Sequence, residues 1–265
     1  MQISDFKYFH NCTYCPCSLL IHPNILELSS DVQSTMMDTR KQNSQPLPHY
    51  CAKSTWENGI GYLVDSRGIR LPGITSILKA TKSPQEKAQL SNWRQRVGTS
   101  EANRISRTSR DRGTLIHKLT KSYFLGESFT CPDSIKPYWE NLLPILQDIH
   151  DVRLIEGNVF HYYEGYAGRV DCVASYHGIP CVIELKSADR IKRLYDEPLQ
   201  LAAYCGALNR QYGVKYGVSL NHALLIATTP DDVSLTWFDP DEVMDYWHKW
   251  QQRVAQFWEQ QKAIA

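Results

Sequence analysis

Three short runs of β-branched and aromatic residues follow one another in the second half of this 265-residue chain, at residues 152–163, 169–176 and 181–187. Such runs are typical of β-strands. Residues 177–180, which read His-Gly-Ile-Pro, supply a turn between the last two runs. Because helical signals precede and follow these runs, the order of elements predicts a mixed α/β domain that contains a β-meander.

Two helix starts are marked by strong local signals. Residues 83–86 read Ser-Pro-Gln-Glu and residues 239–242 read Asp-Pro-Asp-Glu, and each has the form of a capping box with proline at the first helical position. We expect one helix from the first box to about Arg96 and a long C-terminal helix after the second. Spacing predicts further helices at residues 100–110, from 113, at 134–149 and at 197–212, and further strands at 223–228 and 235–238. The expected architecture is a central mixed sheet flanked by helices, with a helical region before it.

The beginning of the chain differs from the rest. Residues 1–55 are polar, with many Ser, Gln, Asn and Pro, and predict a disordered or irregular arm. A single domain is expected over residues 56–265. A hairpin near residues 61–69 and a helical basic region fill 56–150, and residues 151–265 form the core that carries the chemistry.

Composition limits the class of protein. Hydrophobic residues make up 42% of the chain, which is enough for one sizeable core. No apolar run approaches the ~20 residues that a membrane helix needs. The start of the chain has neither the order of a secretory signal nor the pattern of a transit peptide. We therefore expect a cytoplasmic protein with no membrane partner.

The chain has eight cysteines, which we expect to be reduced inside a cell. Cys172 and Cys181 stand in apolar strand-like runs and are expected to be buried thiols. Cys12, Cys15 and Cys17 form the only cluster with metal-like spacing, but no second pair stands at zinc-finger distance. We interpret that cluster as an incidental terminal segment.

Positive charge is concentrated in one stretch although the formal net charge is only +1. Eight Arg and Lys residues stand between Arg94 and Lys121, against two acidic residues. Arg107, Arg112 and Lys121 belong to this stretch. A local basic surface can bind a polyanion even on a neutral protein, whereas the simpler alternative is a solvated helix face.

The most informative residues lie on the expected strands. Residues 168–171 read Gly-Arg-Val-Asp, and residues 183–186 read Ile-Glu-Leu-Lys. Because side chains alternate along a strand, Glu184 and Lys186 are expected to point to the same side. Asp171 precedes Glu184 by thirteen residues with a turn between them, so a hairpin can bring the two carboxylates together.

Two adjacent carboxylates repel each other unless a cation lies between them. Mg²⁺ prefers hard oxygen ligands, so Asp171, Glu184 and the carbonyl oxygen of Ile183 are candidate metal ligands. The ion would polarise a phosphoryl group, and Lys186 could position water or neutralise developing charge. Taken alone the pattern is weak, because a surface strand with an ion pair would look the same.

Further residues agree with this chemistry. His117 stands one turn into an expected helix within the basic stretch, and it is a candidate ligand for a second ion. Gln200 and Tyr204 share one face of the helix that follows the strand of Lys186, and each could bond the backbone or a DNA phosphate. Glu156, in the first strand, could add a carboxylate. Each of these residues also has an easy structural explanation.

Four ordered elements together resemble the PD-(D/E)XK nuclease superfamily, in particular its RecB-type branch. They are Gly113-x-x-x-His117, residues 168–171, Glu184-Leu185-Lys186 and Gln200-x-x-x-Tyr204. Residues 71–78, 195–200 and 246–250 resemble the mitochondrial genome maintenance exonuclease family with its bacterial and phage relatives. The resemblance runs from about residue 70 to the C-terminus.

The resemblance implies a restriction-endonuclease-like core and a DNA exonuclease that uses one or two Mg²⁺ or Mn²⁺ ions and prefers single strands with free ends. It implies that Asp171 and Glu184 bind metal with help from His117, and that Lys186 is catalytic. Some RecB-type nucleases hold an iron–sulfur cluster, which is not expected here because only Cys205 follows Lys186. A bacterial or phage origin is expected rather than a mitochondrial one.

Three alternatives remain open from the sequence. The chain could be a structure-specific or site-specific endonuclease on the same fold, or a non-catalytic DNA-binding module such as a subunit of a recombination complex. It could also be an α/β protein whose charged pairs are only structural, although this leaves the four ordered elements unexplained. Protein partners, the polarity of digestion and the choice between DNA and RNA are not indicated.

Overall fold

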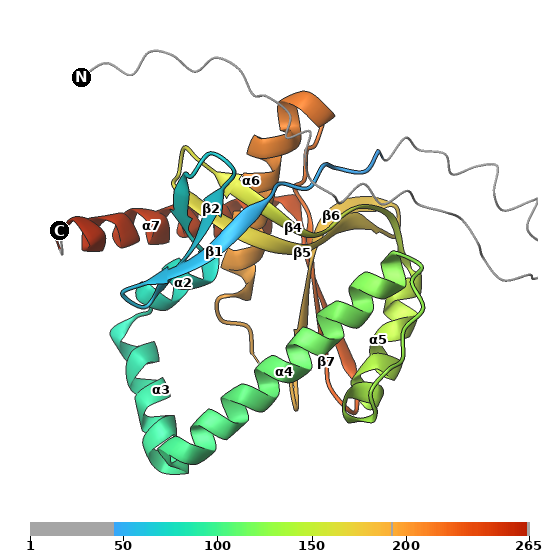
Figure 1. Ribbon diagram of the computed structural model, residues 1–265, viewed down its shortest axis with the longest axis horizontal. Helices are drawn as coiled ribbons and strands as arrows, with labels where there is room; N and C mark the ends of the chain where they lie inside the picture. Colours follow the sequence, from blue (N-terminus) through green and yellow to red (C-terminus); the bar gives the residue numbers. More distant parts are fainter. Residues whose placement is uncertain (1–44, 192, 264–265) are drawn as a thin grey trace, which may run out of the picture. The chain divides into compact units, whose positions relative to one another are not determined.

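A five-stranded sheet in the order β4-β5-β6-β7-β8 organises the computed structural model, which describes residues 45–191 and 193–263 (Figure 1). Its strands are β4 (Ile149–His161), β5 (Tyr166–Tyr176), β6 (Ile179–Ser187), β7 (Ala223–Thr228) and β8 (Val233–Phe238). The first three form an antiparallel meander, β7 runs parallel to β6, and β8 returns antiparallel. The structure therefore confirms the expected α/β class with a mixed sheet flanked by helices.

Helices cover both faces of this sheet, which explains why β5 and β7 are buried almost throughout. On one face, α4 (Thr99–Phe124) and α5 (Lys136–Gln147) pack against alternate residues of β5, β6 and β7. On the other face lie α2 (Ile74–Ala80), α6 (Glu197–Tyr216) and α7 (Pro240–Lys262). Aromatic residues of α7 belong to this core, because Trp250 and Phe257 are fully buried.

The connection from β6 to β7 passes through α6, as a parallel strand pair requires. The connection from β5 to β6 needs only two residues, His177 and Gly178, whose φ angles of 49° and 80° are those of a tight hairpin turn. Cys172 and Cys181, on either side of this turn, are buried as expected. Within the described residues, every helix is too short or too polar to span a bilayer.

A smaller sheet precedes the main one, with the order β1-β2-β3. It consists of β1 (Ala52–Glu57), β2 (Ile60–Asp65) and β3 (Arg70–Pro72), and the turn between β2 and β3 is the expected hairpin turn. The folded region begins before Trp56, contrary to expectation, because the Leu47 side chain is only 3% exposed. The Leu47 amide also donates to the Arg153 carbonyl oxygen at 2.7 Å. The rest of the expected arm, residues 1–44, lies outside the described residues.

Two helices form a projection beside the sheet. The capping box at Ser83 and Glu86 is present, and it opens α3 (Pro84–Val97), none of whose side chains is buried. Helix α4 follows after Gly98, and Figure 1 shows the two helices meeting at a sharp bend away from the sheet. Gly98 has a φ of 84°, which a glycine adopts without strain.

The expected break between residues 110 and 113 does not occur, because α4 is one continuous helix. Gly113 costs the helix about 1 kcal/mol relative to alanine. Burial of Ile116 and Leu119 on the sheet offsets this cost. The prediction of two helices was wrong because a single glycine does not end a helix whose following turns pack on the sheet.

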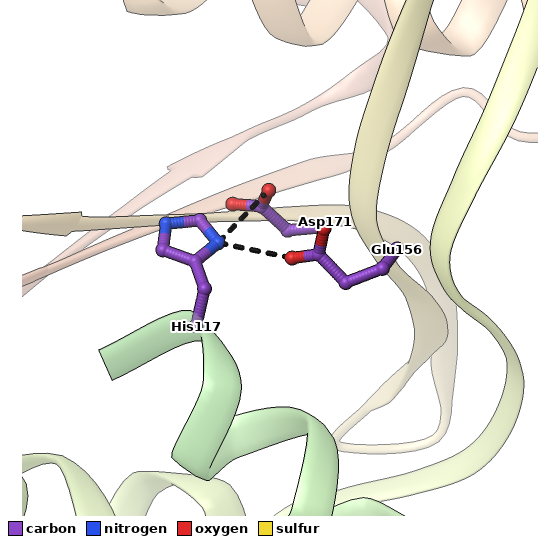
Figure 2. Close-up of side chains that lie close together, drawn as sticks. All are labelled: His117, Glu156 and Asp171. Atoms are coloured by element: carbon purple, nitrogen blue, oxygen red, sulfur yellow. Dashed lines mark hydrogen bonds and ion pairs between the residues drawn. The ribbon is translucent and has the colours of Figure 1, made fainter. Parts of the chain in front are cut away.

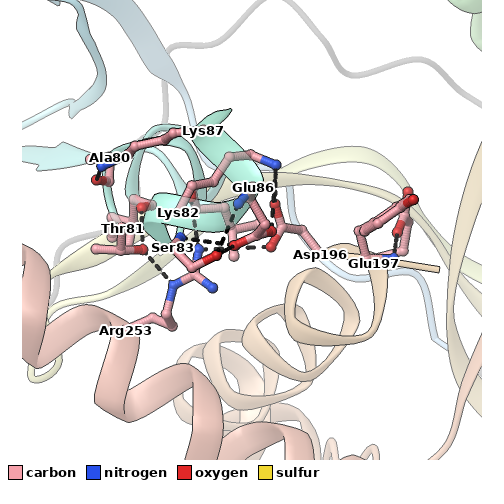
Figure 3. A network of polar contacts seen from close by, with 12 residues as sticks. Ala80, Thr81, Lys82, Ser83, Glu86, Lys87, Asp196, Glu197 and Arg253 are labelled. Carbon is pink, nitrogen blue, oxygen red and sulfur yellow. Dashed lines mark hydrogen bonds and ion pairs between the residues drawn. The ribbon is translucent and has the colours of Figure 1, made fainter. Parts of the chain in front are cut away.

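A polar network anchors the start of α3 to the helices on the other face of the sheet (Figure 3). Lys82 lies 3.2 Å from Asp196, which stands at the N-cap position of α6. Arg253 of α7 donates to the carbonyl oxygen of Leu78 and lies 3.7 Å from Asp196. The network therefore connects α2, α3, α6 and α7 near the beginning of the helix that carries Gln200.

Candidate active site

Strand register aligns three carboxylates across the main sheet. The pairing of β4 with β5 sets Ile155 opposite Cys172 and Gly157 opposite Val170, so that Glu156 lies opposite Asp171. The pairing of β5 with β6 ends at Cys172 and Ile183, and the next position brings Asp171 opposite Glu184. Glu156, Asp171 and Glu184 therefore stand in one row on three neighbouring strands.

Asp171 marks the point where β5 and β6 part. Beyond the last ladder pair, the amide of Leu185 donates to Oδ2 of Asp171 at 2.8 Å. The carboxylate thus accepts a hydrogen bond that a strand carbonyl would otherwise take. This bond holds Asp171 beside β6 although the backbone ladder has ended, and its Oδ1 atom faces α4.

A histidine from α4 completes a cluster with two of the carboxylates (Figure 2). Nδ1 of His117 lies 3.1 Å from Oε1 of Glu156 and 3.3 Å from Oδ1 of Asp171. One ligand atom from each of these residues falls within 4.8 Å of the others. Glu156 has a φ of 50°, a conformation that costs a non-glycine residue about 1–3 kcal/mol.

Glu184 and Lys186 share one side of β6, as the alternation predicted. Nζ of Lys186 lies 2.5 Å from Oε1 of Glu184. Gln200 of α6 donates from Nε2 to the same carboxylate oxygen at 2.8 Å and to the Tyr204 hydroxyl at 3.0 Å. The Tyr204 hydroxyl donates in turn to the carbonyl oxygen of Arg169 at 2.6 Å. Gln200 and Tyr204 therefore tie the strand of Asp171 to the strand of Glu184.

The electrostatics of the cluster reflect crowded negative charge. Burial and the neighbouring Asp171 raise the pKa of Glu184 to about 8, although Lys186 opposes this shift. Burial lowers the pKa of His117, but its hydrogen bonds to Asp171 and Glu156 outweigh burial and raise the pKa to about 10. The pKa of Lys186 is also raised, because the attraction of Glu184 exceeds the effect of burial. Protons and ammonium groups thus balance the carboxylates.

The donor set fits a divalent cation. Oε2 of Glu184 is buried and has no hydrogen-bond partner among the described residues, although a buried carboxylate oxygen normally has one. The nearby cluster offers two further carboxylates and an imidazole, which are ligand types that Mg²⁺ and Mn²⁺ accept. Ile183, whose carbonyl oxygen was a predicted ligand, precedes Glu184 in β6 and pairs with Cys172 and Leu224.

The three basic residues singled out in the sequence occupy different environments. Arg107 and Lys121 are exposed on α4, whereas Arg112 is only 8% exposed. The Arg112 guanidinium donates to Oδ1 of Asp189 at 2.5 Å, to the Tyr138 hydroxyl at 3.1 Å and to Ser187 at 3.3 Å. These partners commit Arg112 to fixing α4 against the end of β6, so we propose a supporting role for it rather than a contact with DNA.

We expect Arg112→Ala to destabilise the fold by about 3 kcal/mol, because it removes a buried side chain and leaves its hydrogen-bond partners unpaired. Thermal unfolding measures this loss. Arg107→Ala is the matched control on the same helix, and it should leave the unfolding midpoint unchanged. An Arg112→Ala variant that unfolds at the wild-type temperature would contradict the supporting role.

Comparison with known proteins finds relatives that all carry the same name. The chain is similar to proteins named mitochondrial genome maintenance exonuclease 1. It is 29% identical to the mouse protein over 208 residues, 27% identical to the human protein over 209 residues and 26% identical to the Xenopus tropicalis protein over 251 residues. These alignments cover 74%, 72% and 90% of this chain.

The same alignments cover 61%, 59% and 67% of the three relatives, so the chain spans about three fifths of the mouse and human proteins. No family model matches the chain. The similarity supports a relationship to nucleases. All three relatives are vertebrate proteins, so they give no support to the expected bacterial or phage origin.

Proposed function

We propose that this chain is a metal-dependent nuclease that hydrolyses phosphodiester bonds of DNA, and that it acts as an exonuclease on single strands with free ends. One observation carries the proposal. Three carboxylates in register meet a histidine from α4 and a lysine on β6, beside a buried carboxylate oxygen that has no partner among the described residues. Structural ion pairs do not require a third carboxylate or an unpaired buried oxygen.

In this proposal Asp171, Glu184, His117 and Glu156 hold one or two Mg²⁺ or Mn²⁺ ions, and the carbonyl oxygen of Ile183 adds a ligand. A bound ion would act as a Lewis acid that polarises the scissile phosphate and lowers the pKa of water. We include Glu156 among the ligands because Nδ1 of His117 contacts the carboxylates of both Glu156 and Asp171.

Lys186 carries the positive charge nearest to this row of carboxylates. Its side chain is 37% exposed, so the ammonium can reach solvent while it contacts Glu184. We propose that Lys186 orients the attacking water and neutralises negative charge that develops on the phosphate oxygens. Gln200 accepts a hydrogen bond from Nζ of Lys186 at 3.2 Å and so keeps the ammonium in place.

Exposed cations on α4 would guide the strand toward this centre. Arg110 and Lys121 lie seven residues before and four residues after His117, so all three lie on nearly the same stripe of the helix. Together with Arg107 they offer positive charge to phosphates. Phosphate contacts carry no sequence information, which favours an enzyme of low sequence specificity.

The features of the site and the names of the relatives also support proposals about the domain, its core and the process in which it acts. We propose that the folded region from Leu47 onward forms one nuclease domain and that β4 to β7 with α6 make a PD-(D/E)XK core of the RecB type. Because the vertebrate relatives are named as genome maintenance exonucleases, we place the activity in DNA repair, replication or recombination inside the cell.

Linear and closed circular DNA distinguish the proposed activity from its alternatives. An end-labelled single strand and a closed circular single strand would be incubated with the chain and Mn²⁺ or Mg²⁺, and the products followed on a denaturing gel. We expect degradation of the linear strand and survival of the circle. Cleavage of the circle would favour the endonuclease alternative. Binding of both strands without cleavage would favour a non-catalytic subunit.

A further inference from the structure

An open cavity of about 310 Å³ lies where three parts of the described chain meet. One wall comes from β1 and β2 and includes Trp56 and Tyr62, and the start of α2 adds a second wall. The third wall consists of Gly168, Arg169 and Tyr204, which belong to the motifs of the candidate active site. The cavity was not expected from the sequence, because its walls are far apart along the chain.

Hydrogen bonds connect the cavity to the row of carboxylates formed by Glu156, Asp171 and Glu184. Tyr204 in the cavity wall bonds the Arg169 carbonyl oxygen and Gln200, and Gln200 bonds Glu184. Arg169 stands two residues before Asp171 on β5. A ligand in the cavity would therefore lie next to whatever occupies the active site.

Trp56 offers a flat surface at the mouth of this cavity. Its side chain is 71% exposed, yet its position is defined by the strand opposite. Trp56 pairs with Gly61, and a Cβ atom at Gly61 would come within 3.2 Å of the indole ring. The glycine thus lets the indole lie against β2 with much of its surface free.

The backbone beneath the indole is held firmly. The Gly61 amide donates to the Ser76 hydroxyl at 2.9 Å, and the Gly61 carbonyl oxygen accepts a hydrogen bond from the Gly73 amide at 2.9 Å. These two bonds fix β2 to the start of α2. Trp56 is consequently presented by a rigid support, which reduces the entropy lost when a flat ligand stacks on it.

Charge indicates which flat ligand fits. Arg169 is the only charged residue among those that line the cavity, and its exposed side chain donates to Oδ1 of Asn158 at 3.5 Å. Tyr62 also lies beneath a cation, because the Arg70 guanidinium, which is ion-paired with Glu57, is 3.7 Å from its ring centroid. Aromatic surface beside positive charge is the combination that binds an unpaired nucleotide, whose base stacks and whose phosphate is anionic.

We propose that this cavity is a base-binding subsite, in which Trp56 stacks on one unpaired base of the DNA strand and Arg169 contacts the adjacent phosphate. The inference rests on the proposed function, since the strand is the one whose backbone crosses the row of Asp171 and Glu184. A single subsite at a fixed distance from the row would determine how many nucleotides separate the bound base from the bond that is cut.

A scan with abasic positions tests the subsite without cleavage. Affinity for a fluorescent single-stranded oligonucleotide is measured by anisotropy in chelator, with an abasic residue moved along the strand. Trp56→Ala should bind the intact strand roughly 5- to 100-fold more weakly than wild type. One abasic position should weaken wild type by a similar factor and should not weaken Trp56→Ala further.

Two variants serve as controls. Tyr163→Ala removes an aromatic side chain that is 84% exposed outside the cavity, and it should bind every strand as wild type does. Trp56→Phe keeps an aromatic face and should recover part of the affinity. Unfolding midpoints of all variants should match wild type, because each change is at an exposed side chain.

The subsite is refuted if Trp56→Ala binds the intact strand like wild type, or if each abasic position weakens both proteins equally. Cleavage by wild type in Mn²⁺ is measured separately. Normal cleavage with either of these results would leave the nuclease proposal standing and remove the subsite. Coupling between Trp56 and one abasic position without any cleavage would support the subsite and remove the nuclease.

Discussion

Lys186→Ala is expected to lower the rate of strand cleavage by about 100- to 1,000-fold, because it removes the charge that stabilises the developing negative charge on phosphate. Nζ of Lys186 lies 2.5 Å from Glu184, within the row of carboxylates, and no other described lysine contacts that row. Single-turnover cleavage of an end-labelled strand in saturating Mn²⁺ measures the effect on the chemical step.

Lys215→Ala is a suitable control, since it removes an exposed lysine from the last turn of α6. It should cleave at the wild-type rate. Lys186→Ala should still bind the strand, which separates loss of chemistry from loss of binding. A Lys186→Ala protein that cleaves as fast as wild type would show that the lysine has no catalytic role.

Asp171→Asn is expected to abolish stabilisation by divalent cations. Wild type at a metal concentration of 100 times its dissociation constant should gain about 2.7 kcal/mol, or roughly 5–10 °C in unfolding midpoint. The asparagine keeps an oxygen that can accept the Leu185 amide, so the variant should unfold near the wild-type temperature in chelator. Because asparagine lacks the negative charge of Asp171, Mn²⁺ should no longer raise the unfolding midpoint of the variant.

Thermal unfolding with and without Mn²⁺ checks this expectation. Asp231→Asn is the matched control, because Asp231 is exposed and lies outside the cluster. It should retain the full gain from Mn²⁺. If Asp171→Asn kept that gain, the metal would bind elsewhere and the proposed ligand set would be wrong.

Local signals in the sequence were sufficient for most of the fold. Capping boxes at Ser83 and Asp239 fixed the starts of α3 and α7, since these hydrogen bonds involve residues only three positions apart. β-branched and aromatic runs located the strands of the main sheet. The continuity of α4 and the burial of Leu47 were missed, because both depend on packing against distant residues.

The candidate site was predictable where it follows from strand geometry. Alternation along β6 places Glu184 and Lys186 together, and a short hairpin brings Asp171 beside them. The contact between His117 and Glu156 was not predictable, because it depends on where α4 packs along β4. Gln200 and Tyr204 were placed on one helix face, but only the structure shows that they connect Glu184 to Arg169.

Arg112 shows the limit of charge patterns. In the sequence it belongs to a run of basic residues and looks like a phosphate contact, whereas its guanidinium is buried against Tyr138 and Ser187. Trp56 shows the opposite case, since this large aromatic side chain is exposed beside a cavity. Residue type alone did not distinguish buried from exposed positions in either case.

Metal dependence of cleavage tests the central claim most directly. An end-labelled single strand would be incubated with wild type in excess chelator and then with Mn²⁺ added beyond the chelator. We expect no cleavage before the addition and rapid cleavage after it, with Asp171→Asn inactive under both conditions. Equal cleavage in chelator and in Mn²⁺, or full activity of Asp171→Asn, would contradict a metal centre built on this row of carboxylates.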